Sequence, residues 1–273
     1  MSIYQFAKSI VLLAGQRIRE ELSQELIIET KSNPNDLVTN MDKETEAFLV
    51  SQINEHYPEH RIIGEEGHGQ DVTDTEGYLW VIDPIDGTLN FVHQQQNFAI
   101  SIGIFHDGKK YAGVIYDVMN DKLYHAEAGH GAYLNDQPLP VLKDTELVTS
   151  IISMNPNWLT KERTRDMYAP IVQAARSARS YGSAALDFAY VATGIIDSYI
   201  TLRLHPWDFS GGMIIAEEVG AVVSNQLGEK LDPLHSSSIL VANPALHQEL
   251  LNDYLSPYRA RLNEIHQGQF SRR

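Results

Sequence analysis

Residues 78–91 read YLWVIDPIDGTLNF, and this stretch places two carboxylates three residues apart where an apolar run breaks into a turn. Residues 78–82 are aromatic, aliphatic and β-branched, which predicts a buried strand. Because proline lacks the backbone donor that a sheet requires, we expect this strand to end at Asp83, before Pro84. The turn would then present Asp83 and Asp86 together at the strand end.

Gly87 and Thr88 follow these acids and suit an anion. Glycine permits close backbone approach, and both amides can face an anion if a helical turn begins there, with the Thr88 hydroxyl as an extra donor. Carboxylates beside such a site would repel a phosphate unless cations lay between them, and Mg²⁺ is the first candidate. The alternative is that the two aspartates only shape a turn. An EF-hand does not fit, because Ile85 and Gln94 occupy its ligand positions.

The composition favours a large folded core. The chain has 273 residues, of which 43% are hydrophobic, so a single domain over 1–273 or two closely packed halves can form. The expected halves are 1–145, with helices, antiparallel sheet and the first acidic motifs, and 146–260, with alternating strands and helices. No internal repeat or low-complexity linker separates them.

The charge and the residue types exclude several classes of protein. The net charge of −15 opposes loose binding to nucleic acid or anionic membranes. The absence of cysteine excludes disulfides and thiolate metal sites and fits a reducing compartment. The apolar run 10–14 is short, and Arg17 and Arg19 follow it, so neither a signal peptide nor a membrane span is expected. We expect a cytoplasmic protein whose partner is a small molecule.

Other acids occur at the ends of predicted elements. Asp42 completes Thr39-x-x-Asp42, which resembles the capping box of a helix, although Asp42 is also explained as a first-turn carboxylate favoured by the helix dipole. Glu65 and Glu66 follow a short apolar strand that begins at Arg61. Taken singly they would be solvated loop residues. Side by side at a strand end, they are candidate metal ligands.

The segment 205–220, HPWDFSGGMIIAEEVG, is the second distinctive stretch. Asp208 lies where an N-cap is expected, and the apolar spacing predicts a helix that stops at Gly220. Capping alone would explain Asp208. Trp207 beside it is more typical of a core residue than of a residue that stacks on a ligand.

Hydrophobic periodicity predicts the remaining elements of the first half. A helix is expected over residues 3–24, and a β-meander over residues 98–126. His106, His125 and His130 lie near the turns of this meander and lack metal-ligand spacing, so we assign them surface or core roles.

The second half alternates between strands and helices from residue 151 to 202. This pattern suggests an α/β layer with its helices outside. The tail from Tyr258 is polar and is expected to be solvated or frayed.

The chain resembles the inositol monophosphatase family. Residues 80–93 read WVIDPIDGTLNFVH, a specific signature of that family, and Glu65-Glu66, the GSAAL of residues 182–186 and Trp207-Asp208 occur in the family's order and approximate spacing. The resemblance covers nearly the whole chain. It implies a layered αβαβα sandwich and a magnesium-dependent, lithium-sensitive phosphomonoesterase that is often a homodimer.

By the family pattern, acidic side chains hold two or three Mg²⁺ ions per subunit. Glu65, Asp83 and the Ile85 carbonyl would hold one ion, and Asp83, Asp86 and Asp208 a second, with Asp83 bridging. Glu65 would also hold a weaker third ion. Two such ions can neutralise developing charge during direct attack of water on phosphorus, so no covalent intermediate is required.

The same resemblance implies roles for residues around the ions. Thr88 would hydrogen-bond the nucleophilic water with Asp42 behind it, and the amides of Gly87 and Thr88 would bind the phosphate. Ser183 and Ala184, together with the stretch before Trp207, resemble the family's wall around the alcohol.

One departure from the family pattern concerns the substrate. Members selective for inositol phosphate commonly carry a glutamate seven residues before the aspartate of Trp-Asp, where this chain has Thr201. Arg203 follows nearby, and a cation there suits a second phosphate. We therefore expect hydrolysis of inositol monophosphate or a similar ester. Activity on fructose 1,6-bisphosphate or NADP is the alternative, and a regulatory protein that binds metal and phosphate without turnover is a third reading.

Overall fold

The computed structural model describes residues 1–22, 27–30 and 37–270. Parts of the predicted loop before Asp42 and of the predicted opening helix lie outside these residues. No helix in the described ranges combines the length and the apolar composition that a membrane crossing requires. The elements are, in chain order, α1 (Ile3–Glu21), β1 (Ile28–Thr30), β2 (Leu37–Thr39), α2 (Asn40–His56), β3 (Arg61–Gly64), β4 (Tyr78–Asp86), α3 (Thr88–Gln94), β5 (Ala99–His106), β6 (Lys109–Asp117), β7 (Lys122–Glu127), β8 (Ala132–Leu134), β9 (Gln137–Pro138), η1 (Leu147–Thr149), β10 (Ile151–Ser153), α4 (Asn157–Thr160), α5 (Glu162–Ala174), β11 (Ser177–Arg179), α6 (Ala184–Ala192), β12 (Ser198–Leu204), α7 (Pro206–Glu218), β13 (Val222–Ser224), β14 (Ser237–Ala242), α8 (Pro244–Glu249), η2 (Leu250–Leu255), η3 (Ser256–Tyr258) and α9 (Arg259–Phe270).

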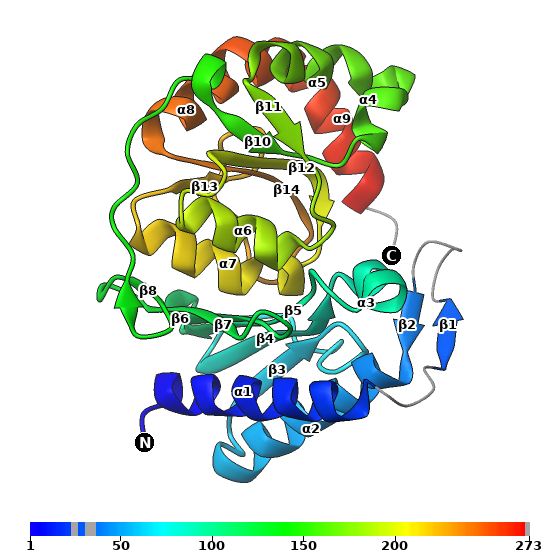
Figure 1. The fold of residues 1–273 in the computed structure, drawn as a ribbon, viewed down its shortest axis with the longest axis vertical. Coiled ribbons are helices and arrows are strands. Elements are labelled where there is room, and N and C mark those ends of the chain that lie inside the picture. The colour runs from blue at the N-terminus through cyan, green and yellow to red at the C-terminus, as the bar shows by residue number, and fades with distance from the viewer. Residues whose placement is uncertain (23–26, 31–36, 271–273) are drawn as a thin grey trace.

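The elements stack in five layers (Figure 1). Helices α1 and α2 cover one face of a seven-stranded sheet of order β3-β4-β5-β6-β7-β8-β9. Helices α6 and α7 lie between that sheet and a five-stranded sheet of order β11-β10-β12-β14-β13, and α4, α5, α8 and α9 form the outer layer. The predicted αβαβα sandwich is confirmed.

Strand β4 is buried on both faces, as its continuous apolar sequence predicts. Trp80 and Ile82 belong to the core beneath α1 and α2, whereas Leu79 and Val81 belong to the core beneath α6 and α7. Because side chains alternate along a strand, one short sequence contributes to two cores. The strand is therefore anchored from both sides, which fixes the position of the acids at its end.

The predicted end of this strand at Asp83 is wrong. Strand β4 continues to Asp86, and its pairing with β5 shifts between Asp83, opposite Ser101, and Asp86, opposite Ala99. The shift is a β-bulge, in which an extra residue accommodates Pro84 despite its missing donor. Both aspartates therefore lie on the strand itself, on either side of the bulge.

Glycines of the seven-stranded sheet face helix α7 and let the helix pack closely against it. A Cβ atom on Gly103 would lie 2.5 Å from the Cβ of Ser210, and one on Gly113 would lie 2.3 Å from the carbonyl oxygen of Gly211. Larger side chains at these positions would push the helix away from the sheet. This close packing brings the first turn of α7, which carries Asp208, to the end of β4.

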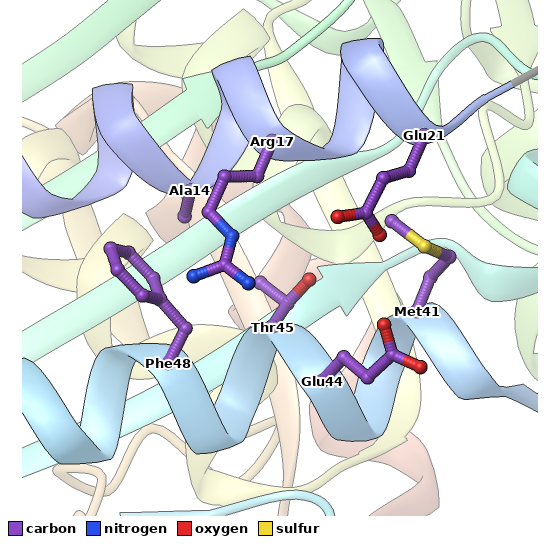
Figure 2. A pocket seen from close by; sticks show the side chains of 7 residues that line it. All are labelled: Ala14, Arg17, Glu21, Met41, Glu44, Thr45 and Phe48. Atoms are coloured by element: carbon purple, nitrogen blue, oxygen red, sulfur yellow. The ribbon is translucent and has the colours of Figure 1, made fainter.

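Helices α1 and α2 pack together with a cavity of only about 10 Å³ between them. Figure 2 shows Arg17 reaching from α1 toward α2, and its guanidinium carbon lies 4.5 Å from the centre of the Phe48 ring. This arrangement is a cation–π contact between two surface helices. The cavity is too small for a substrate, so the contact between α1 and α2 is not a substrate-binding site.

Two predictions for the second half are wrong. The helices do not all lie outside, because α6 packs between the two sheets with residues such as Phe188 fully buried. The tail after Tyr258 is not frayed, because residues 259–270 form α9. Leu262 and Ile265 of that helix are buried in the outer core, the hydrophobic cluster between the five-stranded sheet and the outer helices. The tail therefore folds because it covers the second sheet. The predicted meander is confirmed by β5, β6 and β7.

Candidate active site

Acids from separate elements converge at the end of β4. One carboxylate oxygen from each of Asp83, Asp86 and Asp208 can be chosen so that all three lie within 4.8 Å of one another. Glu65, which follows β3, forms a side-chain hydrogen bond with Asp83, and its charge also acts on Asp208. The parallel pairing of β3 with β4 places Glu65 beside this group.

The acids repel one another, and burial intensifies the effect. Burial raises the pKa of Asp83 well above its ordinary value, and the charges of Glu65, Asp86 and Asp208 raise it further. Burial likewise raises the pKa of Asp208, and the charges of Asp86 and Glu65 raise it further. Grouped buried carboxylates are unfavourable unless protons or cations neutralise them. A set of carboxylate oxygens is the donor chemistry of hard divalent cations such as Mg²⁺, so these residues fit that ion.

Asp86 is held in place by the start of α6. The Ser183 hydroxyl donates a short hydrogen bond to Asp86, and the backbone amides of Ala184 and Ala185 donate to it at 3.2 and 2.8 Å. Burial raises the pKa of Asp86 to about 6, and these three bonds act in the opposite direction. Ser183 and Ala184, predicted to line the substrate wall, do line the cavity, but their hydrogen-bond donors point to Asp86.

The predicted N-cap position of Asp208 is wrong. The N-cap of helix α7 is His205, three residues before Asp208, and Asp208 is the third residue of the helix. The Asp208 carboxylate accepts a hydrogen bond of 2.7 Å from the His205 amide, which forms a capping box. Trp207 stacks on the His205 ring and packs partly buried against the core, in line with the predicted core role.

Thr88 and Asp42 meet across the site. Helix α3 begins at Thr88 with Gly87 as its N-cap, at a φ of 95° that favours glycine, so the predicted helical turn is present. The Thr88 hydroxyl lies 3.1 Å from both the Asp42 carboxylate and the Ile85 carbonyl, and it can donate its proton to either. Asp42 also closes the predicted capping box with Thr39. Capping and contact with Thr88 therefore coexist.

A cavity of about 410 Å³ opens beside these acids. Its lining includes the predicted residues Asp86, Ser183, Ala184, Thr201, Arg203 and Asp208. Thr201 is buried on β12, whereas Arg203 is exposed. Substrate-sized space thus adjoins the acidic group, with a cation at its side.

Several other residues of this cavity carried no recognisable signal in the sequence, among them Trp158, Lys161 and Asp187. Trp158 and Lys161 come from α4 and its C-terminal end, and the Lys161 ammonium lies 4.5 Å from the Trp158 ring centre. Asp187 on α6 also lines the cavity, and burial raises its pKa well above the ordinary value. These side chains lie on short or ordinary helical segments, and only the packing of the second half brings them to the cavity.

The histidines of the meander have no part in this site. His125 is buried, donates through Nε2 to the Asn135 carbonyl at 2.8 Å and accepts at Nδ1 from the Tyr4 hydroxyl. Burial lowers its pKa. His106 and His130 are exposed. The assignment of these histidines to core and surface roles is confirmed.

Comparison with known proteins extends over nearly the whole chain. The inositol monophosphatase family model matches residues 1–259. Inositol-1-monophosphatase of Bacillus subtilis (strain 168) is 51% identical over 255 residues, which span 93% of this chain and 96% of the relative. The structure of inositol monophosphatase II from Staphylococcus aureus MSSA476 is 53% identical, with a TM-score of 0.93 and coverage of 100% of both chains. A structure of inositol monophosphate-bound SaIMPase-II is 52% identical, with a TM-score of 0.90 and coverage of 97% of this chain and 98% of that one.

Proposed function

We propose that this chain, which belongs to the inositol monophosphatase family, hydrolyses inositol monophosphate or a similar small phosphate ester with Mg²⁺ as cofactor. The observation that carries the proposal is the convergence of Asp83, Asp86 and Asp208 within 4.8 Å, next to the helix start at Thr88. Cations at these acids and amides at that helix start are complementary to a phosphate group.

The acids divide into two proposed ion sites. Glu65, Asp83 and the Ile85 carbonyl would hold one Mg²⁺, and Asp83, Asp86 and Asp208 a second, with Asp83 shared. Glu65 would also take part in a weaker third site. When bound, the ions supply Lewis-acid stabilisation of the phosphoryl and leaving oxygens. The support for two or more ions is the number of carboxylates, since a single ion leaves part of their charge uncompensated.

Thr88 and Asp42 are proposed to orient the attacking water. The Thr88 hydroxyl has one proton, which it donates to the Asp42 carboxylate or to the Ile85 carbonyl. Its oxygen therefore presents lone pairs, so that it accepts a hydrogen bond from water and directs the water's own lone pair at phosphorus. The amides of Gly87 and Thr88 would bind phosphate oxygens at the start of α3.

Side chains of the cavity are proposed to choose the alcohol. Ser183, Ala184 and Thr201 line the cavity beside the acids, and Arg203 with Lys161 adds positive charge to the same cavity. These two cations favour the alternative substrates, fructose 1,6-bisphosphate and NADP, because each carries a second anionic group. A regulatory protein without turnover has the least support, because every expected metal ligand is present in this chain.

A substrate panel tests this function. Purified protein with Mg²⁺ is expected to release phosphate from inositol monophosphate at a higher kcat/KM than from fructose 1,6-bisphosphate or NADP. The reason is that the similar proteins are inositol monophosphatases, one of them with inositol monophosphate bound. Faster turnover of a bisphosphate or dinucleotide would replace inositol monophosphate as the substrate. No turnover of any ester, with Mg²⁺ bound, would favour the regulatory reading.

The metal-free protein is expected to gain stability as the pH falls. The folded-state pKa of Asp86 is about 6 against an ordinary 3.8, and those of Asp83 and Asp208 are also raised. Between pH 3.8 and about pH 6, the folded chain therefore holds a proton on Asp86 that the unfolded chain has released. The associated stability is fully present below the unfolded pKa and is lost as the pH rises through the folded pKa.

Thermal unfolding with and without Mg²⁺ measures this linkage. Since Mg²⁺ competes with those protons, the rise in Tm that saturating Mg²⁺ produces is expected to be large at about pH 8 and to shrink toward about pH 5. A Tm increment independent of pH would contradict the placement of the ion among these acids.

Location and assembly are proposed from the composition and from the family. The cysteine-free sequence supports a cytoplasmic protein, and family membership supports a homodimer and inhibition by lithium. Light scattering in solution measures the mass of the assembly, and the phosphate-release assay in the presence of Li⁺ measures the inhibition. A monomer, or full activity at high Li⁺, would contradict the respective proposal.

A further inference from the structure

Helix α2 carries a second buried acid that the proposed mechanism does not use. Glu46 follows Asp42 by one helical turn on the same face of α2, and it is only 2% exposed. Carboxylates are seldom buried to this extent without dedicated partners. The partners of Glu46 therefore indicate its role.

Glu46 binds the backbone of the loop that follows β3. One carboxylate oxygen accepts a hydrogen bond of 2.7 Å from the Glu66 amide, and the other lies 3.4 Å from both the amide and the ring nitrogen Nδ1 of His68. On the other side of the loop, the Glu65 amide donates to the Ile82 carbonyl of β4 at 3.3 Å. Glu65 is thus flanked by one bond to the seven-stranded sheet, from its own amide, and one bond to α2, from the Glu66 amide.

The local sequence is adapted to this contact. A Cβ atom on Gly64 would lie 2.4 Å from the Glu46 carboxylate, so the absence of a side chain there lets the acid lie directly against the strand end. Burial raises the pKa of Glu46, whereas the bonds from the Glu66 and His68 amides lower it. The carboxylate therefore lies between α2 and the loop, where its bonds to backbone amides offset part of the cost of burial.

We propose that Glu46 is a positioning residue that sets the place of the Glu65 carboxylate relative to Asp83, and thereby the affinity of the site for divalent cations. The proposal rests on the function proposed above, in which Glu65 is a metal ligand. With it, one face of α2 supports the site twice: Asp42 contacts Thr88, and Glu46 holds the loop of Glu65.

Glu46→Gln tests this role. The glutamine keeps the shape but turns an amide group toward one of the backbone donors, so the loop loses an anchor. We expect Mg²⁺ to bind about 10-fold more weakly by calorimetry, the loss that is typical when a partner behind a metal ligand is removed. The Mg²⁺ concentration for half-maximal activity should rise equally, with kcat at saturating Mg²⁺ almost unchanged.

Two further variants separate position from charge and from general damage to the helix. Glu44→Gln alters an exposed acid of the same helix that contacts Asn40, and it should leave Mg²⁺ affinity unchanged. Glu46→Asp keeps the charge but is too short to reach both amides, so it should weaken Mg²⁺ binding as Glu46→Gln does. It also supplies the decisive measurement if the glutamine variant does not fold.

Three outcomes would overturn the proposal. The first is wild-type Mg²⁺ affinity in Glu46→Gln. The second is wild-type Mg²⁺ affinity in Glu46→Asp, which would indicate a purely electrostatic effect. The third is a loss of kcat at saturating Mg²⁺ in Glu46→Gln while its Mg²⁺ affinity stays intact. Failure of the proposed function has a different signature, because the wild-type protein would then show no Mg²⁺-dependent hydrolysis of any ester. Calorimetry of Mg²⁺ binding remains a readout in that case.

Discussion

Asp86→Asn is expected to lower kcat/KM by about 10³-fold or more while the chain stays folded. The substitution removes an ionic ligand of the proposed second Mg²⁺ site, and a metal ion contributes several kcal/mol of charge stabilisation in the transition state. A 10³-fold loss corresponds to about 4 kcal/mol. Phosphate release from inositol monophosphate at saturating Mg²⁺ measures the effect.

The structure explains why this variant should fold. The Ser183 hydroxyl and the Ala185 amide bond the same oxygen of Asp86, and the remaining oxygen of asparagine can keep both bonds. The bond from the Ala184 amide, 3.2 Å long, goes to the other oxygen and is therefore the one at risk. Losing one such bond costs about 1–3 kcal/mol, and removing a buried charge from an acidic cluster offsets part of that cost. Near-ultraviolet circular dichroism and the Tm check that the fold is retained.

Asp197→Asn is the matched control for Asp86→Asn. Asp197 also accepts a backbone hydrogen bond, at 2.8 Å from Ile151, but it lies beyond the opposite end of α6 from Ser183. The activity of the Asp197→Asn variant should equal that of the wild type. Wild-type turnover in Asp86→Asn would refute the role assigned to Asp86, and unaltered Mg²⁺ binding in an inactive variant would restrict that role to the chemistry.

Thr88→Val is expected to lower kcat by about 10²- to 10³-fold with little change in Mg²⁺ affinity. Valine has the same shape as threonine but lacks the hydroxyl that contacts Asp42 and Ile85. Water in the site then loses its orienting acceptor, and misplacement of a reactant by about 1 Å can cost 10²-fold. Initial rates give kcat, and calorimetry gives the Mg²⁺ affinity.

Thr88→Ser is the rescue for this variant. Serine restores the hydroxyl, so its kcat should lie within about 10-fold of the wild type, the deficit reflecting the added rotational freedom of its side chain.

The valine variant loses only hydrogen bonds of Thr88, since Asp42 keeps its bonds to Thr39, and its stability should change by about 1 kcal/mol. Wild-type kcat in Thr88→Val would remove Thr88 from the mechanism.

Local sequence was sufficient for much of the fold and of the candidate site. The apolar run before Asp83 encodes a buried strand, Gly87 and Thr88 encode the turn into α3, and Thr39 and Asp42 encode a capping box. Each depends on residues only a few positions apart, whose backbone preferences and hydrogen bonds act locally. The acids themselves were also identified from the sequence, because their residue types and spacing match a family signature.

The errors have a common physical cause. Strand β4 passes Asp83 because its partner β5 accepts a bulge, and the tail after Tyr258 is helical because Leu262 and Ile265 are buried against the outer core. Both outcomes depend on distant surfaces that outweigh local preference. A proline or a polar composition describes the segment alone, whereas its structure depends also on what packs against it.

The amino-acid sequence by itself determined the strands, the turns and the identity of the acids, since these follow from side-chain size, backbone freedom and charge within short segments. Only the tertiary structure decided that Asp208 meets Asp83, that Lys161 and Trp158 face the same cavity, and that Glu46 holds the loop of Glu65. The reason is that these contacts join residues far apart in the chain, and they form only when packing of α2, α6 and α7 against the two sheets brings the residues together.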